Sequence, residues 1–131
     1  MIFLDTSAIY AWADAGDLNH RTAVESLQAI LERGEELLTH SYVLAESVAL
    51  LQARLGLTAA TKLAKDAKAF VIEWVDEDLH ASGIRELTAS KKRQISLVDQ
   101  ISFLVMRHRR VVTAFAFDPD FVSAGFRLFE A

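Results

Sequence analysis

The chain has 131 residues, 52% hydrophobic and 24% charged, which excludes a disordered protein and fits one domain over residues 1–131. Its lack of cysteine excludes disulfides and thiolate metal sites; because no apolar run approaches the roughly 20 residues of a membrane span and no export signal is visible, we expect a cytoplasmic protein without membrane contact. The net charge of −4 argues against electrostatic wrapping of nucleic acid, so such a partner requires a local basic patch or metal ions.

The first predicted element is a short buried strand, Met1 to Leu4, because its apolar run is continuous and too brief for a helix. This strand delivers Asp5 to its carboxyl end. Ligands of parallel α/β sheets bind outside the carboxyl ends of the strands, so Asp5 is a candidate for chemistry. A second interpretation is that Asp5 or Thr6 caps the helix that follows, and this stretch alone leaves both open.

Helices and strands alternate along the rest of the chain. Periodicity and glycine positions predict a helix over Leu18 to Arg33 closed by Gly34, a strand over Glu36 to Thr39, and a helix capped by Ser41 that ends before Gly56. We expect its inner face to carry Leu44, Val48, Leu51 and Leu55, and that of the preceding helix Ala23, Leu27, Ile30 and Leu31.

The second half continues the alternation. Further predicted elements are a helix from Thr58, a strand at Ala69 to Val75, a helix from Asp76 through Leu87, a helix capped by Ser96, and strands at Val111 to Phe117 and Gly125 to Phe129. Strands that alternate with helices predict a three-layer α/β/α sandwich around a central parallel sheet of about five strands, joined by right-handed crossovers.

Three further acids follow strands or open helices in this layout. Glu46 lies near the start of the helix after the second strand, Asp99 lies at position N3 behind the Ser96 cap, and Asp118 directly follows a strand. The topology can bring these side chains to Asp5. Clustered like charges raise one another's pKa unless a cation lies among them, and oxygen-only ligands favour Mg²⁺ or Mn²⁺ over zinc.

Structural explanations exist for each of these acids. Ser96 with Asp99 is similar to a capping box. Asp118 before a proline suits a helix N-cap, and Asp120 is a nearby rival for its place in the site. Glu46 suits either the inner or the solvated side of its helix. The functional interpretation rests on all four acids together.

Four stretches of the chain resemble the PIN-domain ribonucleases, and among them the VapC-type toxins of toxin–antitoxin pairs: FLDTSAIYAW, LTHSYVLAESVALL, ISLVDQISFLVM and AFAFDPDFVSAGFRLF. They occur in the family's order and spacing and cover nearly the whole chain. Two positions differ from the family pattern. Ala116 stands where Thr or Ser is frequent, and Pro119 stands where a basic or polar residue is common.

The resemblance implies that Asp5, Glu46, Asp99 and Asp118 form a catalytic acidic quartet, with Thr6 as a supporting hydroxyl. On this basis we hypothesise Mg²⁺-dependent hydrolysis of RNA, with Mn²⁺ as a possible substitute. Asp5, Asp99 and Asp118 would hold the metal, and Glu46 would orient or deprotonate the attacking water. The resemblance also implies a homodimer and an antitoxin protein whose tail enters the acidic pocket.

Two basic clusters are candidates for phosphate contact. Lys91, Lys92 and Arg93 precede the Ser96 cap and lie close in sequence to Asp99, whereas the cluster Arg107 to Arg110 ends the same helix at its far pole. The first cluster is better placed for RNA, and a solvated loop is its alternative. His20 and His40 have no partner at metal-ligand spacing and are interpreted as surface or capping residues.

Other classes fit less well. A haloacid-dehalogenase phosphatase needs a second Asp two residues after the first, where this chain has Ser7. A receiver domain carries its acidic pair near the start and its phosphoacceptor farther along, and no such arrangement is visible. A PIN nuclease for RNA processing outside a toxin–antitoxin pair and a non-catalytic PIN scaffold are the remaining alternatives, although the scaffold is expected to lose acids that this chain keeps.

Overall fold

The structure, a computed structural model, describes residues 1–131 and contains one sheet of five strands. Every neighbouring pair of strands is parallel, and the order across the sheet is β3-β2-β1-β4-β5. The strands are β1 (Ile2–Leu4), β2 (Leu37–His40), β3 (Val71–Glu73), β4 (Thr113–Phe115) and β5 (Arg127–Leu128). The predicted parallel sheet of about five strands is confirmed.

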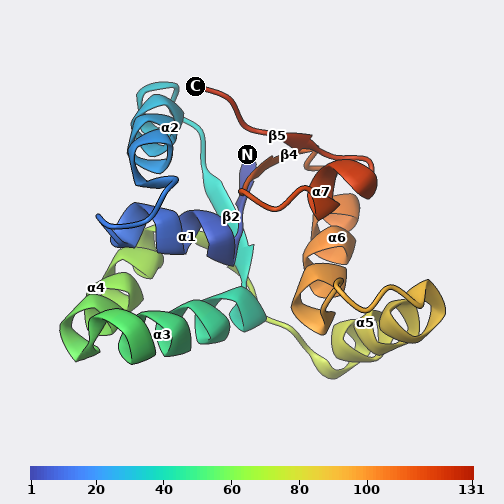
Figure 1. Ribbon diagram of the computed structural model, residues 1–131. Coiled ribbons are helices and arrows are strands. Elements are labelled where there is room, and N and C mark those ends of the chain that lie inside the picture. Colours follow the sequence, from blue (N-terminus) through green and yellow to red (C-terminus); the bar gives the residue numbers. More distant parts are fainter.

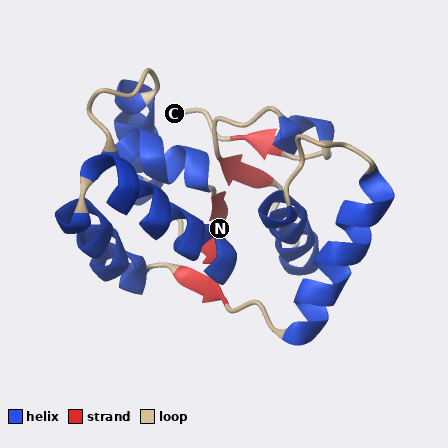
Figure 2. Ribbon diagram, turned by 60° about the horizontal axis from the view of Figure 1, so that its bottom comes forward, coloured by secondary structure: helices blue, strands red, loops and turns tan.

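Helices cover both faces of this sheet (Figure 1). On one side lie α1 (Thr6–Ala13), α2 (His20–Glu32), α3 (Ser41–Leu55), α4 (Leu57–Asp66) and the 3₁₀ turn η1 (Ala67–Ala69). On the other side lie α5 (Glu77–Ser90), α6 (Leu97–Arg109) and α7 (Asp120–Ser123). Figure 2 shows the strands enclosed between these two groups, which confirms the three-layer α/β/α sandwich. None of the helices combines the length and apolar character needed to cross a bilayer.

The core lies between the sheet and the two helical layers, because residues on each strand alternate between its faces. Leu4 of β1 points to the side of α1 and α2, where it lines an apolar groove. Phe3 points to the other side, where its ring lies 6.0 Å from that of Phe121 in α7 and 5.8 Å from that of His40. Burial on both faces explains why the strands read as continuous apolar runs rather than alternating ones.

The predicted elements are present, but β3, β4 and β5 begin later and end earlier than expected. Glycine marks the ends of two helices. Gly34 after α2 and Gly56 after α3 have positive φ angles of 69° and 101°, a region that favours glycine. The predicted cap of α3 is wrong by one residue. His40 is the N-cap, and its side chain accepts from the Val43 N–H, whereas the Ser41 hydroxyl accepts from the Val75 N–H at 2.9 Å.

The predicted inner face of α3 is also displaced. Its buried residues are Val43, Ser47 and Leu51, because α3 packs against α1 through this face and Ser47 contacts Thr6 there. Leu55, which we expected inside, is exposed. In α2 the prediction fails in the same way at Leu31, whose exposed fraction is 62%. The remaining predicted inner residues of α2 and α3 are buried or half-buried.

The buried imidazole of His40 connects the two halves of the molecule. Its Nε2 lies 2.8 Å from the hydroxyl of Ser102 in α6, and that hydroxyl donates its own proton to the Val98 carbonyl at 2.9 Å. Nε2 must therefore be the donor to Ser102, which leaves Nδ1 free to accept from the Val43 N–H. Burial lowers the pKa of His40 from 6.5 to about 4. The fold thus requires a neutral imidazole at this position.

We expect acid to weaken the fold through His40. The unfolded chain takes up a proton near pH 6.5 that the folded chain does not accept until about pH 4, so the free energy of unfolding falls as the pH drops through this window. The loss approaches ~3 kcal/mol, at 1.36 kcal/mol per unit. His40→Asn keeps a cap but removes the titration, so urea unfolding at pH 7 and pH 4 should show a smaller loss for the variant. Equal losses in both proteins would contradict this assignment.

Candidate metal-binding active site

The site lies where the strand order reverses. The chain runs from β1 outward through β2 to β3, then returns to place β4 on the other side of β1. The crevice between the carboxyl ends of β1 and β4 is the position at which parallel α/β sheets bind ligands. Asp5 follows β1 and Asp118 follows β4, and the Asp5 N–H donates to the Phe115 carbonyl at 3.1 Å across this crevice.

Asp5 is buried and caps helix α1. Its Oδ2 accepts from the Ser7 hydroxyl at 2.6 Å and from the Ser7 N–H at 3.2 Å. Burial raises the pKa of Asp5, the hydrogen bonds from Ser7 oppose that rise, and the negative charge of Asp118 adds to it. Both interpretations of Asp5 from the sequence therefore describe the same side chain, which is an N-cap and lies at the end of the first strand.

Asp99 projects from the first turn of α6. It forms the predicted capping box, in which Asp99 Oδ2 accepts from the Ser96 N–H at 3.1 Å and the Ser96 hydroxyl accepts from the Asp99 N–H at 3.2 Å. Burial raises the pKa of Asp99 to about 6, and the charges of Asp5 and Asp118 contribute to the rise. These three carboxyl groups therefore lie within electrostatic range of one another.

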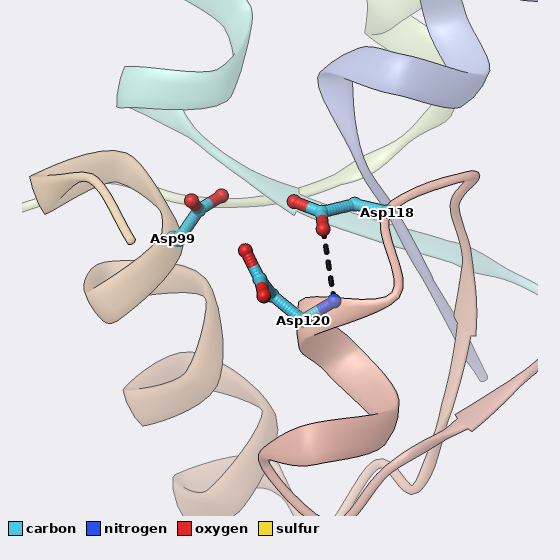
Figure 3. A group of neighbouring side chains, drawn as sticks. All are labelled: Asp99, Asp118 and Asp120. Carbon is cyan, nitrogen blue, oxygen red and sulfur yellow. Dashed lines mark hydrogen bonds between the residues drawn. The ribbon is translucent and has the colours of Figure 1, made fainter. Parts of the chain in front are cut away.

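Asp118 and Asp120 complete a compact group with Asp99. One carboxylate oxygen from each of the three lies within 4.8 Å of the others, and Figure 3 shows the side chains directed toward a common point. Asp118 Oδ1 also accepts from the Asp120 N–H at 2.9 Å.

The predicted cap of the last helix is wrong. We expected Asp118 to cap a helix with Pro119 as its first residue, but α7 begins at Asp120 with Pro119 as its N-cap. Partial burial and the Asp118 charge raise the pKa of Asp120.

Neither Glu46 nor Thr6 is part of this group of carboxylates. Glu46 is exposed on α3, next to Ser47, whose hydroxyl donates to Thr6 Oγ1 at 3.4 Å. That contact holds α3 against the first turn of α1. Thr6 thus bonds to α3, and the hydroxyl that supports the Asp5 carboxylate belongs to Ser7.

Ser7 is the site residue that the sequence reasoning missed. Its hydroxyl donates to Asp5 and accepts from the Phe117 N–H at 2.9 Å. A signal was present, because the second residue after a capping Asp is at the position whose N–H the cap accepts, and a serine there places a hydroxyl within reach of the same carboxylate.

The predicted phosphate-contacting cluster lies in the loop between α5 and α6. Lys91, Lys92 and Arg93 are all exposed, and Lys91 adopts a left-handed conformation that ends α5. The positive charge of Lys92 opposes the rise in the pKa of Asp120, so this side chain lies close enough to the acids to act on them. The other cluster is engaged elsewhere, with Arg109 paired to Glu73 at 3.3 Å and Arg107 over the Phe126 ring.

The donor set fits a hard divalent cation. The three grouped side chains offer only carboxylate oxygens, and the chain has no cysteine. Mg²⁺ and Mn²⁺ prefer oxygen ligands of this kind. The raised pKa values of Asp5, Asp99 and Asp120 indicate negative charge that the protein does not neutralise by itself. A bound cation would supply the missing positive charge.

Fold and site together define a class of α/β domains whose carboxylates collect at the switch point of a parallel sheet. The family model described as PIN domain matches residues 2–127. The 23S rRNA-specific endonuclease VapC20, in two strains of Mycobacterium tuberculosis, is 39% identical over 128 residues, which cover 96% of this chain and 95% of that protein. The chain belongs to the PIN-domain family and, within it, to the VapC-type endonuclease toxins.

A solved structure supports the same assignment. The crystal structure of Mycobacterium tuberculosis VapC20, described as a toxin that cleaves the sarcin–ricin loop, superposes with a TM-score of 0.89 and 34% sequence identity. The match covers 100% of both chains. The resemblance noted from the four sequence stretches is therefore confirmed at the level of family and fold.

Neutralising Asp99 should stabilise the folded chain at high pH. Its pKa is raised from 3.8 to about 6 in the folded state, so the folded chain binds a proton at Asp99 more tightly than the unfolded chain does. The stability gained from this proton is fully present below pH 3.8 and is lost as the pH rises through 6. Asp99→Asn keeps an acceptor for the Ser96 N–H. It should raise the free energy of unfolding by roughly 1–2 kcal/mol at pH 8, allowing for the solvent that reaches this group, and by little at pH 4. Urea unfolding with a chelator present measures both values, and a gain independent of pH would contradict the assignment.

Proposed function

We propose that this protein is a metal-dependent endoribonuclease that hydrolyses RNA phosphodiester bonds with its acidic cluster. The observation that carries the proposal is the group formed by Asp99, Asp118 and Asp120 at the switch point of the sheet, in a chain that belongs to a nuclease family. Asp5 lies within electrostatic range of Asp99. Asp5, Asp99 and Asp118 are the proposed metal ligands, with Mg²⁺ or Mn²⁺ as the ion. Asp120 is a further ligand candidate because its oxygen lies in the same group.

The residues divide the chemistry between them. A bound divalent ion would lower the pKa of a coordinated water and stabilise charge on the scissile phosphate. Glu46 is proposed to orient or deprotonate the attacking water, since it is exposed on the helix that packs against the first turn of α1. Asp99 is held rigidly by its capping box, so its carboxylate keeps a fixed direction.

The proposed substrate is ribosomal RNA. The VapC20 relatives are named as 23S rRNA-specific, and their solved structure is described as cleaving the sarcin–ricin loop. We propose the same target class for this chain, with Lys91, Lys92 and Arg93 as phosphate contacts at the edge of the site. Exposed lysine and arginine side chains next to the acids would offset their repulsion of the RNA backbone.

The proposed regulatory partner is a cognate antitoxin protein, as expected for a VapC-type toxin. An apolar groove of about 730 Å³ lies between α1, α2 and α4, with the exposed Leu31 among its lining residues. Its charged lining residues are Lys62, which pairs with Asp66 at 3.1 Å, and the further lysines Lys65 and Lys68. We propose that an apolar segment of the antitoxin with flanking acidic residues occupies this groove, while its basic tail reaches the acidic pocket. A cytoplasmic homodimer is the proposed form of the toxin.

Asp5→Asn is expected to slow RNA cleavage strongly while leaving the fold intact. The change removes a negative charge whose burial is unfavourable and keeps the shape of the side chain, so the melting temperature should not fall. We expect cleavage of a sarcin–ricin loop RNA in Mg²⁺ buffer to slow by about 10²-fold or more. Asp17→Asn, in the loop before α2, is the matched control. A variant at Asp5 that cuts as fast as the parent would show that the acidic cluster is not catalytic.

Leu31→Glu should separate antitoxin binding from catalysis. A charge at the rim of the apolar groove must lose its hydration when an apolar segment binds, so we expect the dissociation constant for the antitoxin to rise about tenfold or more. RNA cleavage by the free toxin should be unchanged. Val24→Glu, on the same helix but outside the groove, is the control for binding measured by calorimetry. Equal affinity in both variants would place the antitoxin elsewhere.

A further inference from the structure

Ser7 holds the Asp5 carboxylate through one of its two oxygens. The hydroxyl and the backbone N–H of Ser7 both donate to Oδ2, at 2.6 Å and 3.2 Å. Asp5 Oδ1 accepts neither of these two hydrogen bonds. One oxygen is therefore fixed to the first turn of α1, and the other remains open as a ligand. A hydrogen bond as short as 2.6 Å to a charged acceptor is of the strong, charge-assisted kind.

The same hydroxyl holds the segment that carries Asp118. The N–H of Phe117, the residue directly before Asp118, donates to Ser7 Oγ at 2.9 Å. A serine hydroxyl has one proton to give, and Ser7 gives it to Asp5 while its oxygen accepts from Phe117. A single side chain thus bonds to both acid-bearing segments of the crevice.

The sheet itself creates the need for this contact. The Asp5 N–H donates to the Phe115 carbonyl at 3.1 Å as the last rung of the β1–β4 ladder. The next rung of a parallel ladder would run from the Phe117 N–H to the Asp5 carbonyl. That carbonyl already accepts from two N–H groups of α1 at 3.1 Å each, because the chain turns into a helix at Thr6. The Ser7 hydroxyl takes the place of the missing acceptor.

We infer that Ser7 is a positioning residue that sets the distance and orientation of Asp5 relative to Asp118, and through them the affinity of the site for a divalent cation. The inference rests on the proposed metal-dependent function. Asp5 and Asp118 repel each other, so without the hydroxyl Asp5 can turn its carboxylate away and Phe117 loses its acceptor. Removal of hydrogen-bond partners behind metal ligands typically weakens metal affinity or activity by 10–100-fold.

The test compares two substitutions of nearly the same shape. Ser7→Thr keeps the hydroxyl and Ser7→Val replaces it with a methyl group, so the pair isolates the hydrogen bonds from the added volume. The dissociation constant for Mn²⁺, measured by calorimetry at 10 °C without RNA, should rise about 10–100-fold in Ser7→Val and Ser7→Ala. Ser7→Thr should stay within about threefold of the parent. Ser26→Ala, which removes a buried hydroxyl from α2, is the control.

The outcomes separate this role from the proposed function. A parent protein that binds no Mn²⁺ and cuts no RNA would overturn the proposed function. A parent that does both, with Ser7→Val and Ser7→Ala equal to it in Mn²⁺ affinity, would overturn only the role of Ser7. The variants could also bind less Mn²⁺ only because part of the protein is unfolded, as measured by circular dichroism. If the folded fraction then kept the affinity of the parent, the role of Ser7 would likewise be overturned. The Mn²⁺ concentration for half-maximal cleavage should follow the same order as the binding constants.

Discussion

The crowding of carboxylates at one edge of the sheet is the constraint on which the rest of the structure depends. Strand order brings the ends of β1 and β4 together, so Asp5 and Asp118 meet, and the first turn of α6 adds Asp99. Burial and mutual repulsion raise the pKa of Asp99 to about 6 and that of Asp5 above its usual value. The negative charge on these carboxylates therefore destabilises the folded chain. A cation that binds here removes this repulsion, so the repulsion increases the free energy of cation binding. The repulsion that lowers the stability of the folded chain would thus raise its affinity for a metal ion.

The surrounding structure holds these acids with fixed donors and ties the segments that carry them. Ser7 joins Asp5 to the strand end before Asp118, and Ser96 closes the capping box on Asp99. At longer range the neutral imidazole of His40 joins the start of α3 to α6. The contacts of Ser7 with Phe117 and of His40 with Ser102 join elements far apart in the sequence, so they resist the tendency of like charges to separate. Rigidity of this kind is what a metal site requires, because ligands that are already in place lose little freedom when the ion binds.

Much of the fold and of the acidic cluster could be predicted from the sequence, because both depend on local patterns. Apolar runs bounded by caps and glycines predicted the alternation of strands and helices, and acids that follow neighbouring parallel strands meet at one edge of the sheet. The failures lie where tertiary packing decides. The buried residues of α3 differ from the predicted ones because α1 packs against the face that carries Ser47. His40 replaced Ser41 as the cap because its ring is held by Ser102, 62 residues away. Ser7 escaped notice because its second partner, Phe117, is 110 residues away.

Helix capping and metal binding are compatible roles for the same acids. A capping carboxylate is held through one oxygen by helix N–H groups, and the other oxygen can face outward. Asp5 shows this division, since both donors of Ser7 bond to its Oδ2, and Asp99 is likewise held through Oδ2 by the Ser96 N–H. The start of a helix also carries partial positive charge, which offsets some of the repulsion before any ion is present. Capping thus gives each acid a fixed direction and a more favourable electrostatic environment at once. The capping role of an acid at the switch point of a parallel sheet is therefore an argument for metal binding by that acid.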